Sequence, residues 1–172
     1  MKKVFIDGSA GTTGLRIFDR LHRRTDIQLL TLPESERKLE SSRKRLLNEA
    51  DVVFLCLPDD AAREAASWVE NPDTVVLDTS TAHRTAPGWC YGFPELSPVQ
   101  EARLRQAKRI AVPGCHASGF IALVYPLISA GLLAPDVLLS CYSLTGYSGG
   151  GKKMIAEYRA PDRICECSSF WQ

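Results

Sequence analysis

Val4-Phe5-Ile6-Asp7-Gly8-Ser9-Ala10-Gly11-Thr12-Thr13-Gly14 is the stretch of sequence that decides the fold. Its first three residues are apolar and predict a short buried strand, and its glycines predict a tight turn. Leu15, Phe18 and Leu21 then recur at the spacing of one face of a helix. A strand, a glycine turn and a helix in this order open a βαβ unit, so we expect a parallel sheet.

The glycine turn also predicts a dinucleotide site. In such a turn the first glycine allows the sharp bend, the middle one lets the backbone approach a phosphate, and the last lets the helix pack against the strand. A pyrophosphate would rest on the N-terminus of the helix, and the alternative is an ordinary surface turn. The cofactor-binding residues expected here are Gly8, Ser9, Gly11, Thr12, Thr13 and Gly14.

Further strands alternate with helices along the chain. Apolar runs predict strands at 27–32, 52–57, 74–78 and 110–112, with helices ending near Glu49, Glu70 and Ala107. This alternation is typical of an α/β fold with a doubly wound sheet. We therefore expect a Rossmann-type dinucleotide-binding domain over residues 1–114, the beginning of an α+β catalytic domain over 115–160, and a tail over 161–172.

The residues after the second strand indicate which dinucleotide binds. An NAD site places an acid there for the ribose 2′-hydroxyl, whereas an NADP site prefers a cation and a hydroxyl. Ser35, Arg37 and Lys38 fit a 2′-phosphate and predict NADP, although Glu34 and Glu36 lie among them. The alternative is that these residues only form the solvated start of a helix.

A single cysteine stands out as the candidate nucleophile. Pro113-Gly114 gives a turn before Cys115, and an apolar helix follows from Phe120 to Leu133, which we expect to be buried. At a helix N-terminus the backbone N–H groups stabilise a thiolate and lower the pKa of a cysteine. The alternative is that Cys115 is a small buried hydrophobe.

Polar residues follow two of the predicted strands. Residues 79–84 lie at the carboxyl edge of the sheet, where open α/β sheets bind ligands. We expect Ser80 to bind the cofactor and Arg84 to hold an anion. His83 is expected to be an exposed loop residue without a role. A predicted strand at 136–144 leads into a second glycine loop at 145–153. This loop lacks the Walker A pattern, but Gly146, Ser148 and Gly149 are candidates for binding the cofactor in an anion nest, the alternative being a surface turn.

Composition excludes several classes of partner. Lys and Arg total 21 against 20 for Asp and Glu, so no overall field would recruit nucleic acid or an anionic membrane. No apolar run is long enough to span a membrane, and no signal peptide is evident. The six cysteines are scattered without a metal-binding spacing, so we expect reduced thiols, a cytoplasmic location, no metal and a small-molecule substrate.

A dinucleotide fold combined with one reactive cysteine predicts a two-step reduction. The thiolate attacks an acyl carbonyl, expels the leaving group and holds the acyl group as a thioester for the nicotinamide. Backbone N–H groups at the helix start would stabilise the oxyanion. With Arg84 and Lys152 offering positive charge, phosphate is the leaving group expected.

Five motifs together resemble a known family. The glycine turn at 8–14, residues 78–84, Tyr91-Gly92-Phe93-Pro94-Glu95-Leu96, Pro113-Gly114-Cys115 and residues 146–152 are similar to N-acetyl-gamma-glutamyl-phosphate reductase, in its shorter type 2 form. The similarity runs in order from residue 1 to about 160. It implies NADPH-dependent reduction of N-acetyl-gamma-glutamyl phosphate to the 5-semialdehyde in arginine biosynthesis, with Cys115 as nucleophile and with Arg84 and Ser118 binding substrate.

The chain departs from that family in three ways. Val112 replaces a common Asn and His116 a common Tyr, and after about Pro161 the tail ceases to resemble the family. Members continue well beyond residue 172 and carry their catalytic histidine in that portion, whereas the histidines here are His22, His83 and His116. Our hypothesis from this comparison is a prematurely ended chain whose exposed apolar surface favours a homo-oligomer.

Two other functions stay open at this point. One is an inactive NADP-binding remnant of the reductase, and the other is a reductase similar to aspartate-semialdehyde dehydrogenase.

Overall fold

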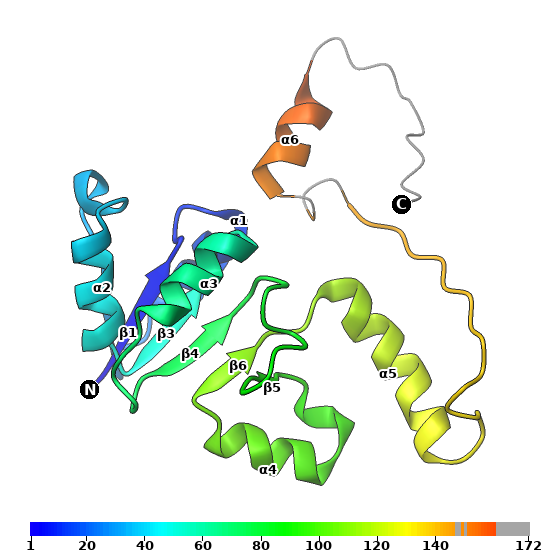
Figure 1. Ribbon diagram of the computed structural model, residues 1–172. Helices are drawn as coiled ribbons and strands as arrows, with labels where there is room; N and C mark the ends of the chain where they lie inside the picture. The colour runs from blue at the N-terminus through cyan, green and yellow to red at the C-terminus, as the bar shows by residue number, and fades with distance from the viewer. Residues whose placement is uncertain (147–148, 150, 161–172) are drawn as a thin grey trace. The chain divides into compact units, whose positions relative to one another are not determined.

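The computed structural model describes residues 1–146, 149 and 151–160, so Ser148 and the tail at 161–172 lie outside the described residues. The chain forms two compact units, Met1–Cys141 and Tyr142–Gln172. The second unit contains the helix α6 (Gly151–Arg159), which the sequence did not lead us to expect. The first unit contains the sheet and the other helices (Figure 1). Cys115 also belongs to this unit.

A six-stranded parallel sheet with the order β2-β1-β3-β4-β6-β5 forms the centre of the first unit. The predicted α/β class is therefore confirmed. The strands are β1 (Lys2–Asp7), β2 (Ile27–Leu30), β3 (Val52–Leu55), β4 (Val75–Asp78), β5 (Cys90–Tyr91) and β6 (Arg109–Ala111). The helices are α1 (Thr12–Leu21), α2 (Glu40–Glu49), α3 (Asp59–Ser67), α4 (Pro98–Gln106) and α5 (Cys115–Ser129), with short 3-10 turns η1 (Glu34–Glu36) and η2 (Pro94–Leu96).

The strand order explains why helices cover both faces of the sheet. The chain moves outward from β1 to β2 through α1 and returns across β1 to β3 and β4 through α2 and α3. Right-handed crossovers that run in opposite directions place their helices on opposite faces. The sheet is thus doubly wound, as the alternation of strands and helices predicts.

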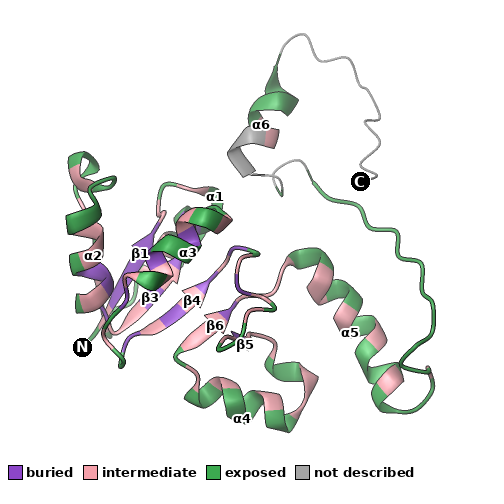
Figure 2. Cartoon of the chain, viewed as in Figure 1, coloured by how far each residue is buried: buried purple, intermediate pink, exposed green. Residues whose placement is uncertain are grey.

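One face of the sheet carries the main core. Phe5, Val53, Leu55 and Val76 of the strands form a buried cluster with residues of α2 and α3. In Figure 2 the strands are buried or intermediate along most of their length, whereas the outer helix surfaces are exposed. The core therefore holds β1, β3 and β4 in register, and their carboxyl ends lie at one edge.

Two expectations about the region after Cys115 are wrong. The helix expected to be buried is α5, and none of its residues is buried: Leu123, for example, keeps 75% of its surface exposed. The strand expected at 136–144 does not form, and residues 134–146 are all exposed. A strand needs a neighbour to satisfy its N–H and C=O groups, and the described part of the chain provides none for this segment. No helix among the described residues is long and apolar enough to cross a membrane.

Candidate functional site

The glycine turn lies where the strand order reverses, between the carboxyl ends of β1 and β3. Gly8 has a φ of +88°, and a Cβ atom at this position would lie 2.3 Å from the carbonyl oxygen of Cys56. A Cβ at Gly14 would lie 2.3 Å from the carbonyl oxygen of Gly8, because α1 packs directly on the turn. These close approaches account for the first and last glycines of the predicted motif.

The helix after the turn is arranged to receive an anion. Gly11 is the N-cap of α1 and adds no side-chain acceptor, and its own N–H donates to the Gly8 carbonyl (2.9 Å). Thr12 and Thr13 form the exposed first positions of α1. Since the first N–H groups of a helix have no intrahelical acceptor, this end of α1 favours a phosphate.

A cavity of about 560 Å³ adjoins the turn at the carboxyl ends of β1 and β2. Its lining includes the start of the turn and both cations predicted to bind a 2′-phosphate; Ser35, predicted with them, is exposed on η1 and is not part of the lining. The lining includes Gly8, Ser9, Leu30, Leu32, Arg37 and Lys38.

An ion pair at the base of this cavity was missed in the sequence. Asp7, at the end of β1, is 5% exposed and accepts hydrogen bonds from Arg43 of α2, with Nη2 to Oδ2 at 2.9 Å. Arg43 also lies 4.8 Å from the centre of the Trp68 ring. The Arg43 guanidinium therefore balances the negative charge of Asp7 inside the protein. No sequence signal links the partners, which stand 36 positions apart.

The acids that obscured the cofactor prediction do not line the cavity. Glu36 accepts a hydrogen bond from the Ser42 hydroxyl at 2.8 Å, and neither Glu34 nor Glu36 is among the lining residues. Arg37 and Lys38 thus give the cavity a positive rim, which suits the 2′-phosphate of NADP better than a free ribose hydroxyl.

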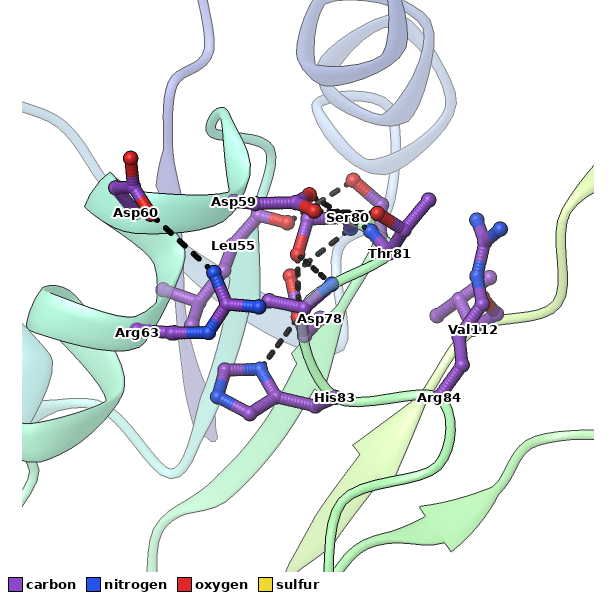
Figure 3. Close-up of polar contacts among 12 residues, drawn as sticks. Leu55, Asp59, Asp60, Arg63, Asp78, Ser80, Thr81, His83, Arg84 and Val112 are labelled. Carbon is purple, nitrogen blue, oxygen red and sulfur yellow. Dashed lines mark hydrogen bonds and ion pairs between the residues drawn. The ribbon is translucent and has the colours of Figure 1, made fainter. Parts of the chain in front are cut away.

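A second cluster lies at the carboxyl end of β4 (Figure 3). Asp78 is fully buried and accepts hydrogen bonds from the Ser80 N–H (2.9 Å), the Ser80 hydroxyl (2.7 Å) and Nδ1 of His83 (2.6 Å). The Ser80 oxygen also accepts from the Ala82 N–H at 3.1 Å. Ser80 therefore organises this loop, and its proposed contact with the cofactor stays a prediction.

The expectation that His83 is exposed is wrong. His83 is 8% exposed and stacks on Trp89, with ring centroids 3.9 Å apart. A buried acid five residues before it and an aromatic residue six residues after it hold the ring on both sides. Sequence alone gave no reason to pair these residues, because loops at strand ends are usually exposed.

Arg84 lies on the opposite side of this loop from His83, toward Val112 (Figure 3). Its Nε donates to the Val112 carbonyl at 3.2 Å, and a Cβ on Gly114 would stand 2.6 Å from its Nη1. The guanidinium therefore lies against the turn that carries Cys115. Among the described residues, no carboxylate lies within ion-pair distance of Arg84, and Asp59 interacts with its charge only from farther away, so the guanidinium can still pair with an anion.

Cys115 is the first residue of α5 and is an exposed free thiol, which does not fit the alternative of a small buried hydrophobe. Gly114 is the N-cap and adds no side-chain acceptor for the first N–H groups. The Ser118 hydroxyl and N–H both donate to the Gly114 carbonyl at 2.8 Å, which fixes the turn. Ser118 thus supports the cysteine position, and its direct contact with substrate stays a prediction.

Cys56 provides a contrast within the same sheet edge. Burial raises the pKa of the Cys56 thiol to about 11, and the negative charges of Asp7 and Asp78 add to the rise. At neutral pH Cys56 is therefore a thiol, and it is unsuited to nucleophilic attack.

The second glycine loop belongs to the other unit. Within that unit the Gly149 N–H donates to the Gly146 carbonyl at 2.8 Å, just before α6 begins. Ser148 lies outside the described residues, and the predicted contact of this loop with cofactor is not tested by the geometry. Within the described ranges no three His, Cys, Asp or Glu side chains are grouped to hold a metal ion.

Comparisons with known proteins agree with this geometry. A protein from Pseudomonas putida named N-acetyl-gamma-glutamyl-phosphate reductase 2 is 52% identical over 92% of this chain and 50% of its own length. The resemblance predicted from the five motifs is therefore confirmed. The chain spans about half the length of the curated relatives it matches.

Solved structures share the fold at lower identity. Aspartate semialdehyde dehydrogenase from Francisella tularensis has a TM-score of 0.66 at 14% identity, over 91% of this chain and 48% of that one. The Candida albicans enzyme, solved with NADP, has a TM-score of 0.54 at 21% identity, over 75% and 47%. The family model described as semialdehyde dehydrogenase, NAD binding domain, matches residues 3–104, more than half of the 172 residues, so the chain belongs to the semialdehyde dehydrogenase family.

Proposed function

We propose that this chain carries the cofactor site and the nucleophile of an N-acetyl-gamma-glutamyl-phosphate reductase, which reduces an acyl phosphate to N-acetyl-glutamate 5-semialdehyde with NADPH. Relatives of that name are about half identical to the chain over nearly all of its length. The observation that carries the proposal is the placement of the Arg84 guanidinium, which forms no ion pair with a described carboxylate, against the Gly114–Cys115 turn.

The proposed cofactor site runs along the carboxyl edge of the sheet. Arg37 and Lys38 would hold the 2′-phosphate, and the N-terminus of α1 would hold the pyrophosphate. From β1 to β6 is three strand spacings, or about 14 Å, so an extended dinucleotide bound at β1 and β2 points toward Cys115. When bound, the nicotinamide supplies the hydride for the reduction.

Cys115 would make the first covalent bond. Its thiolate attacks the acyl carbonyl, the sulfur–carbon bond forms, and the carbon–oxygen bond to phosphate breaks with its electron pair leaving on the phosphate. The N–H groups at the start of α5 stabilise the oxyanion of the intermediate, since they have no acceptor within the helix. Arg84 neutralises charge on the phosphate as it departs.

The free thiols also bear on where the reaction takes place. Cys56, Cys90, Cys115 and Cys141 are all unpaired, and a thiol nucleophile must stay reduced. We accordingly propose a cytoplasmic location for a reaction on a small-molecule substrate.

One assay pair tests the proposal and separates it from its alternatives. Phosphate-dependent reduction of NADP by N-acetyl-glutamate 5-semialdehyde is measured beside NADPH binding, with Cys115→Ser as the test variant and Cys141→Ser as the matched control. The proposal predicts turnover that Cys115→Ser abolishes and Cys141→Ser preserves, with NADPH binding unchanged in both. Binding without turnover would favour a cofactor-binding module, and turnover only with aspartate semialdehyde would favour the other dehydrogenase.

A further inference from the structure

The loop between β4 and Arg84 is held in place by hydrogen bonds to two carboxylates, Asp78 and Asp59. The buried Asp78 accepts three hydrogen bonds from within this loop, two from Ser80 and one from His83. The Thr81 N–H donates to Asp59 Oδ1 of α3 at 3.0 Å, and the Thr81 hydroxyl donates to the other oxygen of that carboxylate. The loop is thereby held to the ends of two elements that belong to the core.

His83 is the member of this loop that immediately precedes Arg84. Nδ1 of His83 lies 2.6 Å from Asp78 Oδ2, and we assign the ring nitrogen as the donor; this bond fixes the ring along one axis. Stacking on Trp89 fixes the plane of the ring. Because both contacts hold the His83 side chain, the backbone of the next residue, Arg84, has a defined position.

The position of this loop also determines where the Arg84 guanidinium lies relative to Cys115. Arg84 extends from this loop to the Val112 carbonyl and to Gly114. No described carboxylate forms an ion pair with it, and Asp59, the acid of α3 that holds Thr81, is near enough to interact with its charge. The Val112 N–H in turn donates to the Asp78 carbonyl at 2.8 Å, so the same residue anchors both sides of the contact. A shift of the loop would therefore move the charge relative to Cys115.

We infer that Asp78 and His83 are positioning residues that hold the Arg84 guanidinium beside Cys115 as a binding group for the anionic part of the substrate. This inference rests on the proposed roles of Arg84 and Cys115. Asp78, His83 and Trp89 would then contribute to the site indirectly, through the position of Arg84, and not through contact of their side chains with the Gly114–Cys115 turn.

The test uses the charge preference of alkylation at Cys115 in the whole chain. Iodoacetate is anionic and iodoacetamide is neutral, so the ratio of their rates reports the local positive charge. Site-resolved mass spectrometry gives that ratio for Cys115, with the exposed Cys141 as reference in the same molecule. One unit of positive charge close to an exposed thiol should raise the ratio by roughly threefold, and high salt should remove the effect.

Variants separate the inference from the function on which it rests. Arg84→Ala and His83→Leu should lower the ratio equally. His83→Asn should retain the ratio, because its amide can replace the Nδ1 donor. The control variant His22→Leu, at an exposed residue, should not change the ratio. If Arg84→Ala lowers the ratio and His83→Leu does not, the positioning role is refuted and the role of Arg84 survives. If Arg84→Ala has no effect, both fail.

A second variant guards against loss of the fold. Asp78→Asn keeps the size of the buried side chain but weakens its acceptor capacity, so it should also lower the ratio. The iodoacetamide rate at Cys115 and the near-ultraviolet circular dichroism show whether each variant is folded. A folded Asp78→Asn variant with the ratio of the unmodified chain would overturn the inference.

Discussion

Gly8→Ala should destabilise the fold more than any other glycine substitution at the cofactor turn. Two costs act together at Gly8. Its φ of +88° disfavours any residue with a Cβ, and that Cβ would stand 2.3 Å from the Cys56 carbonyl oxygen and 2.8 Å from its carbon. Backbone atoms at the end of β3 cannot move aside as a flexible side chain can.

The magnitude follows from adding those costs. A left-handed conformation costs an L-residue roughly 1–2 kcal/mol, and forcing an extra carbon into a packed site costs typically 1–3 kcal/mol. We therefore expect Gly8→Ala to lower the free energy of unfolding by about 2–5 kcal/mol. A cost near the upper end would remove much of the stability of a typical domain.

Gly88 supplies the matched control. Its φ is +81°, nearly that of Gly8, but apart from its two chain neighbours no described residue places an atom within 4 Å of the position its Cβ would take. Gly88→Ala should therefore show the conformational cost alone, roughly 1–2 kcal/mol. The assay is urea unfolding followed by circular dichroism and tryptophan fluorescence. Equal losses for the two variants would refute the claim that the turn packs against the carboxyl end of β3.

Three further predictions concern the two halves of the site. Arg37→Ala combined with Lys38→Ala should weaken NADPH binding by about tenfold or more and should change NADH binding little. Titration of nicotinamide fluorescence measures both affinities, with Arg20→Ala as the control. Equal weakening of NADPH and NADH binding would refute a 2′-phosphate site. Arg43→Met should lower the free energy of unfolding by about 3 kcal/mol, because it leaves the Asp7 carboxylate buried without its partner, and adding Asp7→Asn should restore much of the loss in urea unfolding. Iodoacetamide at pH 7.5 should label Cys115 far ahead of Cys56, since a pKa of about 11 leaves roughly one Cys56 thiol in three thousand ionised. Labelling of Cys56 should rise as the pH approaches 11, and peptide mapping that finds equal rates at pH 7.5 would contradict the assignment.

The sheet and the cofactor turn were predictable because their signals are local. The apolar runs at β1, β3 and β4 and the glycines at 8–14 each specify structure through neighbours in sequence, and the doubly wound order follows from the handedness of the crossovers. The placement of Cys115 at the start of α5 was predicted in the same way from Pro113-Gly114.

The missed features depend on side-chain contacts that no local sequence pattern marks. Arg43 reaches Asp7 from another helix, and His83 is buried only because Asp78 and Trp89 enclose it. Hydrophobicity also misled for α5 and for residues 136–144, since an apolar sequence is buried or paired only if another element covers it, and none in the described part of the chain does.

The measurement that tests the central claim most directly is the capture of the acyl-enzyme. The chain is mixed with N-acetyl-gamma-glutamyl phosphate without a nicotinamide cofactor, quenched in acid and analysed by peptide mass spectrometry before and after treatment with hydroxylamine. The account predicts one N-acetylglutamyl group on Cys115, removed by hydroxylamine as a thioester is, absent from Cys115→Ser and reduced in Arg84→Ala. A folded chain that carries no adduct on Cys115, or that carries the same adduct in Cys115→Ser, would contradict the account.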